Sequence, residues 1–301
     1  MDQPSLPRSI RSFDDVRALD AAAGRRKTPC GDGAMVWHVW GGDGPPVVLL
    51  HGGSGSWTHW VRNITALVDA GRRVWIPDLP GFGDSARPPA GGDADALPPW
   101  VAQGLDELLG DTPCDLVGFS FGAMVGTFVA EQRPERVRRL VLVGAPALST
   151  QRTRPPGLRS WGGLPPGPEL DAIHRHNLRV LMLHDEASLD RLALDVHASN
   201  LARDRMKRRR LSQTDVLLRT LPHVRCPVAG IWGAHDVLYR GRMEILEPAL
   251  ARAPRFESLT LIAGAGHWVQ FEAAEAFDAA LAEVLARPLD AAPAPATGSG
   301  A

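Results

Sequence analysis

The chain has 301 residues and a mass of 32.4 kDa, with 44% hydrophobic and 22% charged residues. This composition is typical of a globular domain and excludes a fibrous or wholly disordered chain. The 33 basic and 34 acidic residues give a net charge of −1, which offers no electrostatic footprint for nucleic acid. The sequence has no apolar stretch long enough to span a bilayer and no signal-peptide core, so we expect a cytoplasmic protein.

Short continuous apolar runs predict strands that are buried on both faces, as in a parallel sheet. These strands are expected at residues 46–50, 74–76, 116–117, 140–143, 228–232 and 259–262, with an antiparallel strand before them at 36–40. Stretches of helical length lie between or after them, at residues 60–70, 100–109, 121–132, 242–251 and 273–286. This alternation predicts an α/β fold with a mostly parallel central sheet and helices on both faces.

The alternation stops at residues 146–222, where a segment rich in proline and glycine leads into helical patterns without strands. We interpret this segment as a helical cap inserted into a core made of residues 1–145 and 223–287. It departs from the end of a predicted strand, where ligands bind in open parallel sheets, so it is placed to cover a pocket. The tail, residues 288–301, has low complexity and is predicted to be disordered.

The pentapeptide Gly118-Phe119-Ser120-Phe121-Gly122 follows a predicted strand and opens a predicted helix. Such a sharp turn exposes the serine, and side chains at positions 118 and 122 would collide with the neighbouring strand and helix. The Gly-x-Ser-x-Gly pattern in this strand–turn–helix setting indicates that Ser120 is a nucleophile.

A serine hydroxyl needs a base that accepts its proton and a carboxylate that orients the base. Downstream of Ser120, both residue types follow predicted strands: Asp236 after strand 228–232 and His267 after strand 259–262. The strand after the nucleophile helix ends in Gly144-Ala145-Pro146, without a carboxylate that could replace Asp236.

With serine, acid and base in this chain order, the sequence resembles the α/β-hydrolase superfamily over about residues 30–287. The resemblance implies the α/β-hydrolase fold and a triad of Ser120, His267 and Asp236. It also implies an oxyanion hole formed by the backbone N–H groups of Gly53 and Phe121. Gly53 lies in a glycine-rich turn after strand 46–50, where the backbone can approach a developing oxyanion closely.

Large side chains beside these segments are candidates for the pocket wall. They are Trp57, Trp161, His197 and Trp268. The basic run at residues 207–210 has two interpretations: it contacts an acidic substrate, or it forms a solvated cap surface, as charge runs usually do.

No metal and no organic cofactor is expected. The three cysteines, Cys30, Cys114 and Cys226, are far apart and predict neither a disulfide framework nor a cysteine metal site. The turn that contains Gly53 and Gly55 has threonine at position 58, so the dinucleotide-binding pattern fails.

The expected activity is hydrolysis of a small carboxylic ester through an acyl-enzyme. Serine at the elbow argues against the haloalkane dehalogenases and epoxide hydrolases of the superfamily, which carry aspartate there. Residues 266–272 are similar to the matching segment of the carbon–carbon bond hydrolases that act on meta-cleavage products, although His197 stands where those enzymes carry a cap arginine. This activity remains an alternative, as does a non-catalytic ligand receptor. The expected partner is a small molecule, without nucleic acid or membrane, and the chain is expected to be a monomer or homodimer.

Overall fold

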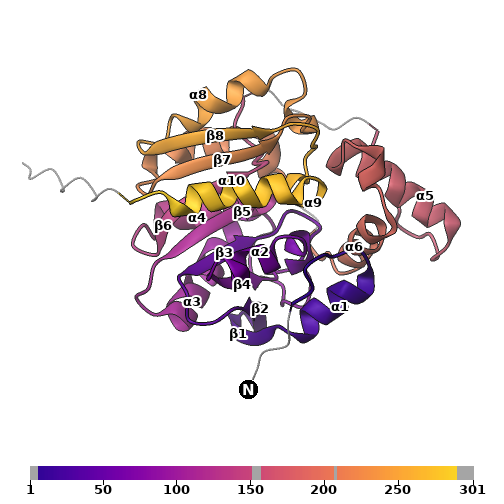
Figure 1. The fold of residues 1–301 in the computed structure, drawn as a ribbon, viewed down its shortest axis with the longest axis horizontal. Helices are drawn as coiled ribbons and strands as arrows, with labels where there is room; N and C mark the ends of the chain where they lie inside the picture. The colour runs from indigo at the N-terminus through magenta and orange to yellow at the C-terminus, as the bar shows by residue number, and fades with distance from the viewer. Residues whose placement is uncertain (1–5, 151–156, 207–208, 290–301) are drawn as a thin grey trace, which may run out of the picture.

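The computed structural model describes residues 6–150, 157–206 and 209–289. They form an eight-stranded sheet with the order β1-β2-β4-β3-β5-β6-β7-β8 (Figure 1). The strands are β1 (Gly24–Cys30), β2 (Gly33–Trp40), β3 (Pro46–Leu50), β4 (Arg73–Pro77), β5 (Cys114–Phe119), β6 (Val137–Val143), β7 (Val228–Gly233) and β8 (Phe256–Ile262). Strands β3 to β8 are parallel, whereas β2 pairs antiparallel with β4 and β1, so the predicted α/β fold is confirmed.

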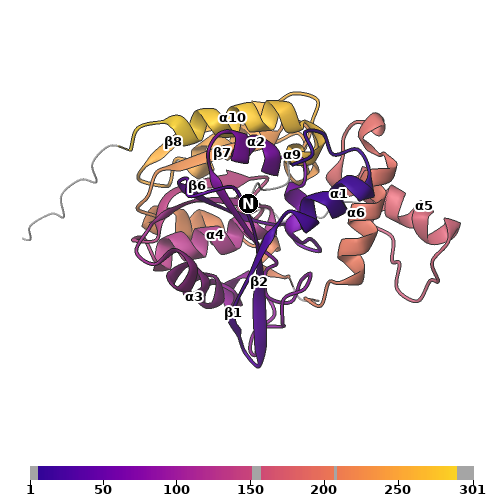
Figure 2. The ribbon, with the colours of Figure 1, turned by 60° about the horizontal axis from the view of Figure 1, so that its bottom comes forward.

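Helices cover both faces of the sheet, because successive residues of each buried strand point to opposite sides. On one face, α3 (Pro98–Leu109), α4 (Phe121–Gln132) and α8 (Leu246–Leu250) pack on residues such as Leu50 and Leu116. On the other, α2 (Ile64–Asp69) and α10 (Ala274–Ala286) pack on residues such as Leu49 and Val117. Figure 2 shows α2 and α10 on one side of the sheet and α3 and α4 on the other.

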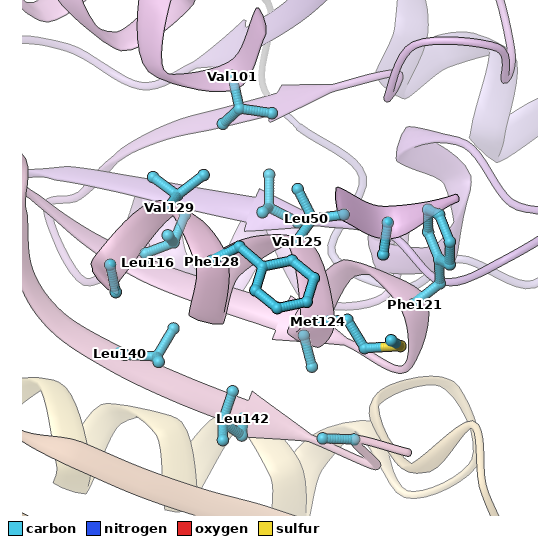
Figure 3. Packing of buried hydrophobic residues seen from close by; sticks show 14 of the residues in the cluster. Leu50, Val101, Leu116, Phe121, Met124, Val125, Phe128, Val129, Leu140 and Leu142 are labelled. Carbon is cyan, nitrogen blue, oxygen red and sulfur yellow. The ribbon is translucent and has the colours of Figure 1, made fainter. Parts of the chain in front are cut away.

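The close fit of α4 against the sheet fixes the position of the loop that precedes this helix. Met124, Val125 and Phe128 belong to the same buried cluster as Leu116 and Leu140 on the strands below (Figure 3). Each buried apolar side chain of this size stabilises the folded state by about 1.5–3 kcal/mol. The start of α4 is therefore held rigidly at the carboxyl end of β5.

The parallel register brings the carboxyl ends of four adjacent strands to one edge. Phe119 at the end of β5 pairs with Val143 of β6, and Val143 pairs with Ile231 of β7. In turn, Gly233 at the end of β7 pairs with Ile262 at the end of β8. The loops that leave these strands therefore meet at a single edge, where ligands bind in open α/β sheets.

Between β6 and β7, the regular elements of the described residues are helical. The α-helices among them are α5 (Pro168–Asn177), α6 (Arg191–Ala202) and α7 (Val216–Thr220). Helices α5 and α6 lie beside the sheet domain, whereas α7 packs against α4 (Figure 1). Apolar residues of the segment, such as Leu178 and Val196, belong to one buried cluster with Leu49 and Ile231 of the sheet.

The amino-terminal elements α1 (Phe13–Ala21) and β1 were not expected from the sequence. Ser12 caps α1, since its hydroxyl accepts from the Asp15 N–H and the Asp15 carboxylate accepts from the Ser12 N–H. Residues 290–301 of the tail predicted to be disordered lie outside the described residues. None of the helices described is both long and apolar enough to span a membrane.

Candidate active site

Ser120 stands at the turn between β5 and α4 with φ +50° and ψ −113°, a backbone conformation that residues other than glycine rarely adopt. The flanking glycines allow this turn. A Cβ at Gly118 would lie 2.5 Å from the carbonyl oxygen of Gly122, and one at Gly122 would lie 2.4 Å from that of Leu50. The Ser120 N–H donates to the Val143 carbonyl at 2.8 Å, which fixes the turn to β6.

His267 connects Ser120 with Asp236 at this edge of the sheet. Its Nε2 lies 3.0 Å from Ser120 Oγ, and its Nδ1 lies 2.9 Å from Asp236 Oδ2. The other carboxylate oxygen of Asp236 accepts from the Leu238 N–H at 2.9 Å. The side chains of His267 and Asp236 are buried. The structure thus brings the three residues predicted as the triad into one hydrogen-bonded line.

Gly144, at the end of β6, makes room for this line. It has φ +52°, and a Cβ there would lie 3.2 Å from the imidazole of His267 and 3.3 Å from Asp236 Oδ2. From the sequence, Gly144 was notable only because it is not a carboxylate. In the structure, it leaves space for the histidine–aspartate pair.

The turn with Gly53 and the start of α4 present free N–H groups beside Ser120. None of the described residues accepts a hydrogen bond from the N–H of Gly53 or of Phe121. A helix of this length leaves its first N–H groups without intrahelical partners. The sequence predicted these two N–H groups as oxyanion donors, and both residues line the cavity next to the serine.

Two neutral histidines hold the glycine turn in place. His51 Nδ1 donates to the Gly52 carbonyl at 2.8 Å, and its Nε2 accepts from the Leu79 N–H at 2.9 Å. His59 Nδ1 accepts from the Gly52 N–H at 3.2 Å. Burial lowers the pKa of His51 to about 4 and the pKa of His59 well below its usual value, so both rings are neutral at pH 7.

Asp78 supports the same turn from β4. Its two carboxylate oxygens accept from the N–H groups of Trp57 and Asp84, at 2.9 and 2.8 Å. Burial raises the pKa of Asp78 to about 6 against the opposing effect of these hydrogen bonds. A Cβ at Gly83 would lie within 3 Å of the carboxylate, so the loop can wrap around Asp78 only with glycine at this position.

A cavity of about 290 Å³ opens beside Ser120. Its wall is formed by residues at the carboxyl edge of the sheet and by apolar residues of the segment between β6 and β7. The lining residues are Gly53, Ser54, Phe119, Ser120, Phe121, Pro146, Leu158, Leu181, Met182, Arg209, Ser212, Gln213, Leu238 and His267. The volume suits a small substrate rather than a polymer.

Arg209 brings a positive charge to the wall of this cavity. Its Nη2 donates to Ser54 Oγ at 2.9 Å, and its Nη1 lies 3.0 Å from Asp204 Oδ2. Ser54 in turn donates to Asp204 at 2.6 Å. The basic run had two interpretations from sequence, a substrate contact or a solvated surface, and the structure places Arg209 beside Gly53. Residues 207–208 of the run lie outside the described residues.

The four residues predicted for the pocket wall do not line this cavity. Trp57 is buried against His38 and Trp40, and Trp268 is stacked on Phe271 with ring centroids 4.1 Å apart. His197 lies half-buried on α6, with its ring 5.4 Å from that of His174, and Trp161 is 38% exposed. Proximity in sequence to a catalytic loop does not fix the direction of a side chain, and these side chains fill the packing behind the loops or face outward.

Within the described parts of the chain, the side chains of His38, Asp78 and Asp84 form a group with ligand atoms within 4.8 Å of one another. Asp78 already accepts two backbone hydrogen bonds. Asp84 pairs with Arg25 and Arg203, at 3.4 and 3.2 Å. The acidic charges of this group are thus already balanced by the protein itself, which argues against a cation site here.

Comparison with known proteins matches residues 45–274 to the family model described as the alpha/beta hydrolase fold. The 2-hydroxymuconate semialdehyde hydrolase of Pseudomonas sp. (strain CF600) is 32% identical over 268 residues, which cover 81% of this chain and 88% of that protein. The dihydrolipoyllysine-residue acetyltransferase component of the acetoin cleaving system of Pseudomonas putida is 31% identical, and the match covers 83% of this chain and 66% of that protein.

Among solved structures, a carboxylesterase from Bacillus subtilis superposes with a TM-score of 0.72 at 20% identity, covering 88% of this chain and 92% of that one. At that identity the likeness concerns the fold. The chain belongs to the α/β-hydrolase family, and its relatives and structural neighbours include hydrolases, among them esterases.

Proposed function

We propose that the protein is a serine hydrolase that hydrolyses small carboxylic esters through an acyl-enzyme at Ser120. The observation that carries this proposal is the hydrogen-bonded line from Ser120 Oγ through His267 to Asp236. Ser120 and His267 line a cavity of about 290 Å³. The hydrolases among the relatives support the reaction class.

In this proposal, Ser120 Oγ attacks the ester carbonyl carbon while His267 Nε2 takes the hydroxyl proton. Asp236 holds the Nδ1–H of the ring and stabilises the imidazolium. The oxyanion accepts hydrogen bonds from the N–H groups of Gly53 and Phe121, each worth about 10²–10³-fold in rate where such donors have been removed. His267 then protonates the departing alkoxide, and water, activated by the same ring, releases the acid.

We also propose that residues 146–222 act as a cap that selects the substrate, with the catalytic core in residues 1–145 and 223–287. Leu158, Leu181 and Met182 bring apolar surface from this segment to the cavity. The helices α5 and α6 lie at the side of the sheet domain (Figure 2). The substrate in this proposal is a small molecule with an apolar acyl or leaving group.

The test is labelling of the purified protein by a fluorophosphonate, together with hydrolysis of a chain-length series of nitrophenyl esters. We expect stoichiometric labelling of Ser120 and turnover of the short esters. Ser120→Ala should fold and lose both, and Asp236→Asn should lose about 10⁴-fold in rate, as the equivalent substitution does in serine proteases. A wild-type protein that is neither labelled nor active would favour a ligand receptor.

A second candidate is hydrolysis of a carbon–carbon bond of the meta-cleavage product type. The 32% identity to the 2-hydroxymuconate semialdehyde hydrolase favours it, whereas the neutral imidazole of His197 provides no cation where those enzymes carry a cap arginine. Burial lowers the pKa of His197 to about 3. Direct comparison of a nitrophenyl ester with a dienoate meta-cleavage product decides between them, since the better substrate is the one with the larger kcat/KM.

A further inference from the structure

We propose that Glu272 is a positioning residue for His267, which it orients through the backbone of the loop that carries the histidine. This inference rests on the proposed function, because it concerns the base of that reaction. Glu272 ends the short helix α9 (Val269–Glu272), five residues after His267. It does not line the cavity beside Ser120, so it acts without touching the substrate.

The carboxylate of Glu272 connects two separate segments of the chain. Its Oε2 accepts from the Gly266 N–H at 2.5 Å, and Gly266 directly precedes His267. Its Oε1 accepts from the N–H groups of His184 and Asp185, at 2.7 and 2.6 Å. Each oxygen thus serves one segment: the histidine loop, or the end of the stretch that lines the cavity with Leu181 and Met182.

The two segments run against each other along their backbones. The Trp268 N–H donates to the Met182 carbonyl at 2.8 Å, immediately beyond the histidine. A Cβ at Gly266 would lie 2.8 Å from the His184 nitrogen and 3.1 Å from Glu272 Oε2. Both sequence neighbours of His267 are therefore held by hydrogen bonds: Gly266 by the carboxylate of Glu272, and Trp268 by the carbonyl of Met182.

This arrangement needs a carboxylate. A side chain with two acceptor oxygens can satisfy N–H groups from both segments, and hydrogen bonds to an ionised acceptor are about twice as strong as neutral ones. An amide in its place offers one acceptor and turns an NH₂ donor toward the N–H groups of the other segment. Loss of these hydrogen bonds should let the loop that carries His267 shift, and small displacements of a catalytic group strongly reduce the rate.

The experiment compares Glu272→Gln with wild type and with Glu275→Gln, which removes an exposed carboxylate three residues further along the chain. The readouts are the rate constant of fluorophosphonate labelling, the pH profile of kcat/KM on a short nitrophenyl ester, and the number of sites titrated. We expect Glu272→Gln to have as many titratable active sites as wild type. It should react about tenfold more slowly, with a shifted pH profile and a smaller change in KM. Glu275→Gln should match wild type, and Glu272→Asp, which keeps both oxygens, should recover part of the rate.

The outcomes separate the two proposals. A labelled, active wild type with Glu272→Gln at the same labelling rate and pH profile overturns the role of Glu272 alone. Slower turnover caused only by fewer titrated sites also overturns it, because that pattern reports a loss of folded protein. A wild type without labelling or turnover overturns the proposed function and this inference with it.

Discussion

Gly144, at the end of β6, lies so close to the ring of His267 that a side chain there would press on the imidazole. The Cα of Gly144 faces the ring so closely that a Cβ would stand 3.2 Å from both its Nδ1 and its Cε1. The backbone there has φ +52°, which disfavours any side chain independently of the contact. The position is therefore restricted twice, once by backbone conformation and once by the imidazole.

Gly144→Ala should lower ester turnover and fluorophosphonate labelling by at least about tenfold, because the new methyl displaces the imidazole from the serine. Gly241→Ala is the matched control: Gly241 has φ +70°, and a Cβ there would meet no atom within 4 Å, so this variant carries the backbone cost alone. Rates and thermal unfolding of both variants are compared. Equal activity of the two variants would mean that the contact with His267 has no effect on catalysis.

Arg209→Met should lower the turnover of esters that carry a carboxylate more than the turnover of neutral esters. The guanidinium lies in the cavity wall with a bond to Ser54 and an ion pair with Asp204, and its five N–H donors exceed these two partners. We expect kcat/KM to fall about tenfold for a carboxylate ester and much less for its neutral methyl analogue. An equal loss on both esters would show that Arg209 acts only by holding Ser54.

Leu181 should control the length of the acyl chain that the cavity accepts. Leu181→Ala enlarges the space beside Ser120 and is expected to shift the preference toward longer nitrophenyl esters, whereas Leu181→Trp is expected to restrict turnover to the shortest ones. Leu261→Ala, an exposed position on β8, serves as the control. Unchanged chain-length preference in both Leu181 variants would contradict the cap as a determinant of selectivity.

Stability should fall in mild acid because of buried imidazoles. Burial lowers the pKa of His38 and His51 to about 4 and that of His197 to about 3, against about 6.5 in the unfolded chain. Between pH 6.5 and 4 the unfolded chain binds protons that the folded protein does not, so the free energy of unfolding decreases as the pH falls. Burial also raises the pKa of Asp78 to about 6 and of Asp278 to about 7, which offsets part of this loss.

His197→Gln tests this balance by urea unfolding at about pH 7.5 and about pH 5. Removal of one such imidazole should reduce the loss of unfolding free energy between the two pH values by about 1–2 kcal/mol. His223→Gln, which removes an exposed imidazole, should leave the loss as in wild type. The same loss in His197→Gln as in wild type would show that His197 does not contribute to the pH dependence.

The parallel part of the sheet was predictable because its strands are continuous apolar runs. The expected strand at 46–50 coincides with β3, and the predicted helix at 121–132 coincides with α4. Strand β1 was not predictable in the same way: it lies at the sheet edge, begins with four exposed residues and carries Arg25, Arg26 and Lys27. Edge strands are commonly charged, so the hydrophobic pattern that identifies buried strands is missing there.

In the candidate site, too, the residues that local sequence patterns mark were predictable, and those placed by tertiary packing were not. Ser120, Asp236 and His267 are tied to local patterns at strand ends, and parallel strand ends meet at one edge. Arg209 reaches the cavity from a distant segment by tertiary packing, which no local pattern reports. For the same reason, the tryptophans next to the catalytic loops could not be assigned to the cavity or to the core from sequence alone.

The order of the strands also determines when in its synthesis the protein can become active. Ser120 follows β5, but its proposed base, His267, follows β8, 147 residues later. A ribosome-bound chain that lacks β8 and the loop after it contains the proposed nucleophile but not the proposed base. If the proposed mechanism holds, labelling of Ser120 should therefore report completion of this strand, and a nascent fragment should not hydrolyse substrate before β8 and the loop after it have emerged.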